Sequence, residues 1–256
     1  ASFDSMQLFW ATDTRDINPV HADDRLIRIL GLDREKLPPL KGSTDILGTV
    51  LPAVADAIGI PRDAKVVMGS PDHQCALIGS GAVREYEGHI YIGTSSWVQC
   101  IVPFKKSDIF RSIASIPTAI PGKYQSANEQ DLAGGCLGFL GDNILFHRND
   151  LVTGEPPENP YEIMDEVARG VEAGSHKLIF TPWLNGERSP IDDHHVRAGF
   201  FNQSLDTTAD DLIRAVFEGV AFNSRWLLGY VEKFTGRPLS ELRAVGGGAN
   251  SRVWCE

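Results

Sequence analysis

Residues 66–81 constrain the fold more than any other stretch, because an apolar run passes through Gly-Ser-Pro into a segment of small residues. That order predicts a strand, a tight turn and then a helix. Asp72 lies at the turn, so we expect a carboxylate where a strand ends and a helix begins, a common position for a site in open α/β folds. The structural alternative is that Asp72 caps the helix by accepting from the free N–H groups of its first turn.

Two further strands are each expected to end in a turn of small residues. One covers residues 88–93 and is followed by Thr94 and Ser95, and the other covers residues 242–245 and is followed by three glycines from Gly246. Backbone N–H groups and hydroxyls in such turns can hold phosphate oxygens, and glycines let the backbone lie flat against a ring or a phosphate. A plain turn is the alternative at both places.

The longest helical pattern covers residues 208–234, where apolar residues recur every four positions. Thr207 and Asp210 suit its first turn, and Gly236 suits its end. Residues 49–58 also read as a helix. Because strands and helices alternate along the chain, the sequence predicts an α/β fold.

Composition and charge exclude several classes of partner. Hydrophobic residues make up 42% of the 256 residues, as in an ordinary globular protein. The formal net charge is -10, and this negative charge argues against binding to nucleic acid or an anionic membrane. No signal peptide is visible, and no apolar run approaches the roughly 18 residues that span a bilayer. The four cysteines form no C-x-x-C pair, so we expect reduced thiols in a cytoplasmic protein.

Residues 192–195 read Asp-Asp-His-His, which at first suggests a metal site. Adjacent side chains on an extended loop point in different directions, so a solvated loop is the interpretation we adopt. No metal-ligating residue is therefore assigned from the sequence.

Four motifs together resemble, in their order and spacing, the carbohydrate kinases of the FGGY family. They are Gly-Ser-Pro-Asp-His-Gln at residues 69–74, Gly-Thr-Ser-Ser at 93–96, Gly-Glu-Arg-Ser-Pro at 186–190 and Gly-Gly-Gly-Ala-Asn at 246–250. The Gly-Glu-Arg-Ser-Pro and Gly-Gly-Gly-Ala segments are the most specific of these. The resemblance runs along nearly the whole chain.

This resemblance implies the ribonuclease-H-like fold shared by actin, hexokinase and the Hsp70 ATPase domain. Residues 1–84 would be the end of the family's N-terminal, sugar-binding domain, and residues 85–256 its nucleotide-binding C-terminal domain, truncated. The family's opening Asp-x-Gly-Thr strand is missing, and the sequence stops soon after the triple glycine. We therefore expect a chain that is incomplete at both ends and inactive as an isolated fragment.

The implied reaction is transfer of the γ-phosphoryl group of ATP to a hydroxyl of a sugar or polyol, with Mg²⁺ bridging phosphate oxygens. Similarity to xylulokinases favours a ketopentose such as xylulose, while ribulose, gluconate and glycerol stay open as acceptors. The partners would be the sugar and ATP, and a homodimer is also left open. The alternative is a non-catalytic or degenerate nucleotide-binding module, since fold does not fix function.

Asp72 is the candidate general base for the acceptor hydroxyl, and Gln74 is expected to orient that acceptor. A glycine at the adenine contact, Gly247, is expected to have a positive φ. The residues expected to bind ATP are Gly93, Thr94 and Ser95 at the terminal phosphates, Gly134 and Gly135 at a Gly-rich helix start, and Gly247, Gly248 and Asn250 at the adenine and ribose end.

Overall fold

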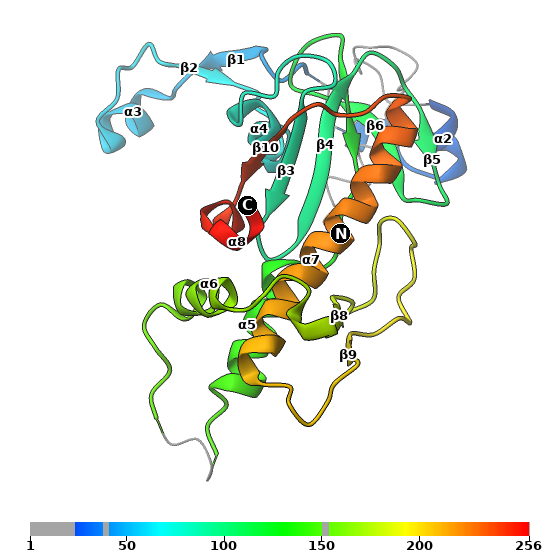
Figure 1. Cartoon of the computed structure of the whole chain (residues 1–256). Helices are drawn as coiled ribbons and strands as arrows, with labels where there is room; N and C mark the ends of the chain where they lie inside the picture. The colour runs from blue at the N-terminus through cyan, green and yellow to red at the C-terminus, as the bar shows by residue number, and fades with distance from the viewer. Residues whose placement is uncertain (1–23, 38–40, 150–153, 256) are drawn as a thin grey trace.

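A six-stranded sheet lies at the centre of the computed structural model, which describes residues 24–37, 41–149 and 154–255 (Figure 1). The strand order is β10-β3-β4-β7-β6-β5, with β10 parallel to β3 and every other neighbouring pair antiparallel. The strands are β3 (Gly88–Ile92), β4 (Ser96–Val102), β5 (Ser107–Asp108), β6 (Ile113–Pro117), β7 (Tyr124–Ala127) and β10 (Leu242–Val245). The strands predicted at 88–93 and 242–245 are thereby confirmed, and the structure adds that they are neighbours in one sheet.

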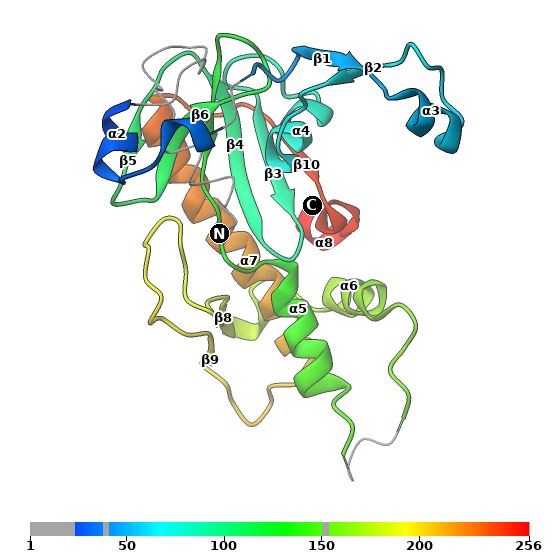
Figure 2. The same cartoon turned by 180° about the vertical axis from the view of Figure 1, so that it is seen from behind.

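Helix α7 (Ala209–Thr235) covers one face of this sheet, as Figures 1 and 2 show from opposite sides. The C-terminal half of the helix contributes apolar side chains to a core that it shares with β4 and β7. That core contains Val98, Cys100, Val102, Tyr124, Leu227, Val231 and Phe234. Alternation along β4 therefore points one set of its side chains at α7 and the other set at the opposite face.

Helix α4 (Asp72–Gly79) crosses that opposite face from β6 to β10. At its start, Gln74 Nε2 donates to the Pro117 carbonyl oxygen at 2.8 Å. Its middle packs against Ile101 on β4 through Leu77, and beyond its end the Ser80 carbonyl accepts from Arg243 Nη1 of β10 at 3.5 Å.

A capping box at Thr208 begins α7, at the residue where the predicted helical pattern starts. Thr208 Oγ1 accepts from the Asp211 N–H at 3.3 Å, and the Asp211 carboxylate accepts from the Thr208 N–H at 2.8 Å. Asp210 lies in the first turn as expected, but the cap is Thr208 and not Thr207, because the reciprocal bonds join Thr208 to Asp211 three residues later. Gly236 ends the helix with φ 77°, as expected.

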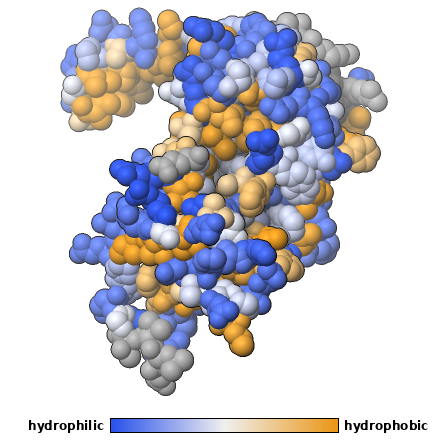
Figure 3. Space-filling model, in the orientation of Figure 1, coloured by the Kyte–Doolittle hydropathy of each residue, from blue (hydrophilic) through white to orange (hydrophobic). Residues whose placement is uncertain are grey.

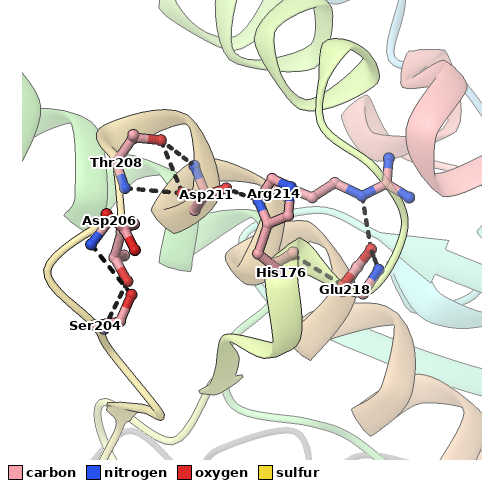
Figure 4. Close-up of polar contacts among 10 residues, drawn as sticks. His176, Ser204, Asp206, Thr208, Asp211, Arg214 and Glu218 are labelled. Carbon is pink, nitrogen blue, oxygen red and sulfur yellow. Dashed lines mark hydrogen bonds and ion pairs between the residues drawn. The ribbon is translucent and has the colours of Figure 1, made fainter.

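A left-handed turn leads from α6 (Pro160–Gly170) to β8 (Ile179–Thr181) and is tied to the first half of α7 (Figure 4). All three residues of Ser175–Lys177 have positive φ. His176 Nδ1 lies 2.8 Å from Asp211 Oδ1, and the Ser175 hydroxyl donates to Glu218 at 2.9 Å. Side-chain bonds from α7 therefore hold a backbone conformation that L-residues seldom adopt.

The lower part of the molecule in Figure 1 gathers α5, α6, α8, the β8–β9 hairpin and the first half of α7 around a second core. The elements not yet bounded are α5 (Gly134–Leu140), β9 (Gly199–Phe201) and α8 (Arg252–Cys255). The buried side chains of this core include Leu137, Leu140, Met164, Phe180 and Phe217. The Gly-rich helix start predicted at residues 131–140 is confirmed as the beginning of α5.

An arm, residues 43–69, projects from the body of the molecule and holds β1 (Ile46–Thr49), α3 (Pro52–Ile58) and β2 (Lys65–Val67) (Figure 1). Within the described residues β1 and β2 pair only with each other, and Figure 3 shows apolar surface over the arm. The large exposed apolar side chains there include Ile46, Leu47, Leu51, Ile58, Val67 and Met68. The helix expected from residue 49 begins three residues later, because Thr49 is still part of a strand.

Helix α2 (Asp24–Ile29) is the first element of the described chain. No helix in the part of the chain that the structure describes is long and apolar enough to cross a bilayer. All four cysteines are free thiols, with Cys100 and Cys136 buried and Cys75 and Cys255 exposed.

Candidate functional site

The β3–β4 corner, residues 93–95, is a tight turn in which the Gly93 N–H donates to the Ser95 carbonyl oxygen at 2.9 Å. Beside it, the Tyr91 and Trp97 rings stack with centroids 3.9 Å apart. A Cβ on Gly93 would lie 2.3 Å from Tyr91 Oη, so glycine lets the turn lie against that ring. The hydroxyls of Thr94 and Ser95 make no hydrogen bond to any residue that the structure describes, which leaves both available to a ligand.

The start of helix α5 is bonded directly to this corner. The Gly134 N–H donates to the Gly93 carbonyl oxygen at 2.8 Å, and the N–H groups of Ala133 and Gly135 donate to the Thr94 carbonyl oxygen at 2.7 and 3.1 Å. A Cβ on Gly134 would lie 2.7 Å from the Gly93 carbonyl oxygen. Two of the segments predicted to contact ATP are therefore in contact with each other.

The glycine turn, residues 246–250, lies on the last residue of β3. A Cβ on Gly246 would be 2.4 Å from the Ile92 carbonyl oxygen, and one on Gly248 would be 2.4 Å from Ile92 Cγ2. The expected positive φ at Gly247 is wrong: it falls on Gly246, at 93°, because the chain must turn over Ile92 as soon as β10 ends. A Cβ on Gly247 would meet open space, so Gly247 presents the free surface of the turn.

Helix α6 anchors the far side of the glycine turn. Asp165 Oδ1 accepts a short hydrogen bond from the Ser251 hydroxyl and a longer one, at 3.5 Å, from the Val253 N–H at the start of α8. Trp254 Nε1 donates to the Phe217 carbonyl oxygen at 2.9 Å, which joins α8 to α7. Asn250 stays exposed at the end of the turn. The three predicted ATP-binding segments thus meet at one end of β3, between α5 and α8 (Figure 1).

Asp72 and Gln74 lie apart from this cluster. Asp72 is the first residue of α4, its side chain is 97% exposed, and its Oδ1 accepts from the His73 N–H at 2.7 Å. Pro71 occupies the capping position, so Asp72 is not the N-cap. Gln74 is buried against Pro117. Across the described residues, no hydrogen bond or ion pair joins either side chain to the β3–β4 corner.

The strand predicted before Asp72 is present as β2, but it lies outside the central sheet. β2 pairs with β1 in the arm, so Asp72 follows a peripheral hairpin and not a strand of the central sheet. The apolar run that predicted β2 is exposed, which periodicity in so short a strand does not reveal.

His73, beside Asp72, is a residue that sequence reasoning passed over. Burial lowers the pKa of its imidazole, while the nearby carboxylates of Asp72 and Glu129 act in the opposite direction. Its Nδ1 is 3.6 Å from Asp72 Oδ1, and its Nε2 is buried with no partner among the described residues. The position of His73 next to Asp72 is the only sequence signal for it.

Glu187 and Arg188 in the Gly-Glu-Arg-Ser-Pro motif were also given no role from sequence. Arg188 forms ion pairs with Glu129 and, at 3.6 Å, with Asp131, at the approach to α5. Glu187 is buried and accepts hydrogen bonds from three directions, although burial raises the pKa of its carboxyl. The motif therefore lies against the cluster at the end of β3.

In the loop at residues 192–195, the two aspartate side chains contact the two histidines of the same loop. His194 Nε2 is 3.8 Å from Asp192 Oδ1, and the His195 N–H donates to Asp193 Oδ1 at 2.7 Å. Within the described ranges, no three His, Cys, Asp or Glu side chains come together in a way that could hold a metal ion.

Comparison with known proteins relates both parts of the chain to one family. Residues 88–256 match the C-terminal domain of the FGGY family of carbohydrate kinases, and residues 11–79 match its N-terminal domain. The sequence is 30% identical to xylulose kinase of Lactococcus lactis subsp. lactis (strain IL1403), over 92% of this chain and 45% of that protein. It is 26% identical to gluconokinase of Bacillus subtilis (strain 168), over 95% of this chain and 47% of that protein.

Comparison with solved structures also relates the chain to sugar kinases. The fold is similar to gluconate kinase from Lactobacillus acidophilus, with a TM-score of 0.77 and 26% identity over 93% of this chain and 46% of that chain. Ligand-bound xylulose kinase from Lactobacillus acidophilus gives a TM-score of 0.76, also at 26% identity, over 93% of this chain and 46% of that chain. The chain spans about half the length of the curated relatives it matches.

Proposed function

The chain belongs to the FGGY family of carbohydrate kinases, and from this premise we propose that it forms the ATP-binding part of an enzyme that phosphorylates a hydroxyl of a sugar or polyol. Its mixed α/β fold is the actin-like, ribonuclease-H-like fold of the sugar kinases that it resembles. We divide it into residues 1–84, from the sugar-binding domain, and residues 85–256, from the nucleotide-binding domain. The two matched ranges, 11–79 and 88–256, support that division.

The observation that carries the proposal is the meeting of three glycine-containing segments at the end of β3. The free hydroxyls of Thr94 and Ser95 and the N–H groups of the corner are donors of the kind that hold terminal phosphates. The open surface at Gly247 and the exposed Asn250 are suited to the planar base and the ribose. ATP bound in this way would have its phosphates at the β3–β4 corner and its base over the glycine turn.

Asp72 is the proposed general base. As the new P–O bond forms, the acceptor hydroxyl loses its proton, and an exposed carboxylate that is held by one local N–H bond can take it. Gln74, proposed to orient the acceptor, is buried, and its amide nitrogen donates to the Pro117 carbonyl oxygen, which holds the start of α4 against β6. Such a transfer depends mostly on holding the acceptor and the phosphate in line.

We propose that Mg²⁺ binds together with the nucleotide, through its phosphates. The described residues offer no three-carboxylate cluster that would hold the ion by itself. Mg²⁺ commonly keeps several waters and binds through substrate phosphates with one or two carboxylates. We therefore assign no side chain of this chain as its ligand.

The acceptor we propose is a ketopentose such as xylulose, with ribulose, gluconate and glycerol as the competing acceptors. Relatives of this chain are named xylulose kinase, gluconokinase and autoinducer-2 kinase. The test is sugar-dependent ADP release by the complete protein with a panel of these acceptors, beside Asp72→Asn under the same conditions. Turnover with one acceptor that is lost in the variant would support the proposal. Nucleotide binding without turnover on any acceptor would favour a non-catalytic nucleotide-binding module instead.

A further inference from the structure

Glu187 is held in the loop between β8 and β9 by a short paired segment. The Glu187 N–H donates to the Asp193 carbonyl oxygen at 2.9 Å, and the Asp193 N–H returns a bond of 2.8 Å to the Glu187 carbonyl oxygen. The residue is only 1% exposed, although it is a glutamate. A carboxylate in such a place is costly unless donors surround it, so its partners reveal its role.

All three polar partners of the Glu187 side chain are donors. Oε1 accepts from the N–H groups of Arg188 at 2.9 Å and Asp131 at 3.1 Å, and Oε2 accepts from Asn223 Nδ2 at 2.5 Å. The orientation of the Asn223 amide is fixed in turn, because its Oδ1 accepts from Trp183 Nε1 at 3.4 Å. The pocket therefore fits an acceptor-only carboxylate, and an amide or a protonated acid would bring two donors face to face.

These bonds connect helix α7 to the α5 entry, residues 131–135. Asn223 lies in the middle of α7, and Asp131 lies just before the N–H groups that reach the β3–β4 corner. The path from α7 to the corner thus runs through Asn223, Glu187, Asp131 and the Gly134–Gly93 bond. The Ser224 hydroxyl next to Asn223 adds a second, weaker bond of 3.3 Å to Gln130 Oε1.

We propose that Glu187 is a positioning residue for the nucleotide: by bonding Asn223 and the Asp131 N–H at once, it fixes the α5 entry and, through it, the β3–β4 corner. The inference rests on the proposed function, in which that corner receives the terminal phosphates of ATP. Glu187 is buried behind the corner and does not touch the ligand itself.

The test exchanges the donor and the acceptor across the Glu187–Asn223 contact in the complete protein. Glu187→Gln keeps one oxygen for the two N–H groups but sets its Nε2 against Asn223 Nδ2, and flipping Asn223 would break the bond from Trp183. Adding Asn223→Asp restores a donor–acceptor pair and leaves an oxygen for Trp183. Since a lost bond to a buried charge corresponds to roughly a tenfold to hundredfold change, we expect Glu187→Gln to raise the KM for ATP by about tenfold or more. The KM for the sugar should change little, and the double variant should recover most of the loss.

Hydrogen exchange provides a readout that does not depend on activity. Amides of residues 131–140 should exchange faster in Glu187→Gln and return toward the wild-type rate in the double variant. Glu218→Gln is the matched control, because Glu218 also accepts from a backbone N–H, at 2.9 Å from Gly174, and from a hydroxyl, but these donors belong to the α6–β8 connection and not to the α5 entry. Its substitution should leave exchange over residues 131–140 and the KM for ATP unchanged.

The outcomes separate the inference from the function on which it rests. Wild-type protein that turns over none of the acceptors would overturn the proposed function, while exchange over residues 131–140 would still test Glu187. Unchanged exchange in Glu187→Gln would overturn the positioning role, as would a double variant no better than the single one. Equal rises in both KM values would do the same, because a general loss of structure does not discriminate between the two substrates.

Discussion

The backbone N–H of Gly134 donates a 2.8 Å hydrogen bond to the carbonyl oxygen of Gly93. This contact joins the first residue of α5 to the corner between β3 and β4, across some 40 residues of sequence. A side chain on Gly134 would put a Cβ 2.7 Å from the oxygen that accepts this bond. The requirement for glycine at this position therefore comes from the tertiary contact of two segments.

Replacing the proposed base should separate binding from chemistry. Asp72→Asn keeps the shape of the side chain and an oxygen that can accept from the His73 N–H, so α4 should be undisturbed. Because an amide cannot take the proton of the acceptor, kcat should fall by about 10²–10⁴-fold. Steady-state turnover and calorimetric ATP titration would be measured on the same preparation. Wild-type turnover in this variant would mean that the proton goes elsewhere.

Two neighbouring glycines should respond differently to valine. Gly247→Val adds a side chain in open space, so the fold should persist while ATP affinity falls by about tenfold or more. Gly246→Val places a Cβ 2.4 Å from the Ile92 carbonyl oxygen at a φ of 93°, so it should lower the melting temperature itself. Calorimetric titration and thermal unfolding of both variants distinguish these effects. Unchanged affinity in folded Gly247→Val would make the glycine turn a purely structural feature.

His89 should make the protein less stable in mild acid. It is 0% exposed on β3, both ring nitrogens lack partners among the described residues, and burial lowers its pKa from 6.5 to about 4. Between those pH values the unfolded chain binds a proton that the folded chain does not, so stability should fall by about 3 kcal/mol as the pH drops through this window. His89→Leu should remove most of that loss, as measured by denaturant unfolding across the window. If the free energy of unfolding of His89→Leu fell with pH as steeply as that of the wild type, this account would be contradicted.

His176, in contrast to His89, should make the folded protein more stable in mild acid than in mild base. Its hydrogen bond and charge interaction with Asp211 raise the pKa of the imidazole, so the folded chain holds the proton more tightly than the unfolded chain (Figure 4). The stabilisation is fully present below the unfolded pKa and is lost as the pH rises through the raised folded value. His176→Gln should therefore be destabilising in mild acid and nearly neutral in mild base. Equal effects in both conditions would show that packing, and not charge, is what His176 contributes.

Sequence patterns predicted those elements whose residues carry their own signal. Strand β3 and helix α7 followed from local periodicity, and the end of α7 followed from Gly236, whose positive φ favours glycine. Strands β5, β6 and β7 were not predicted. They lie in residues 107–127, where serines, prolines and one glycine mask the alternation, and β5 is only two residues long.

The site could be predicted in part for the same reason. Two turns of small residues after strands and one Gly-rich helix start are visible in the sequence, and all three pointed to residues that the structure brings together. Glu187 gave no such signal, because its bonds to Asn223 and Asp131 span 36 and 56 residues. The placement of Asp72 after the arm was missed because strand pairing depends on partners that a short apolar run does not specify.

The parallel pairing of β10 with β3 determines the order in which the molecule can be assembled. The two strands are about 150 residues apart, so their pairing closes a long loop and is expected to come late in folding. Until then, β3 is the outer edge of the sheet, with its hydrogen-bonding groups open to other chains. The turn that completes the nucleotide surface follows β10 directly. ATP would therefore stabilise only molecules in which β10 has already paired with β3, because the proposed nucleotide surface is incomplete before that step.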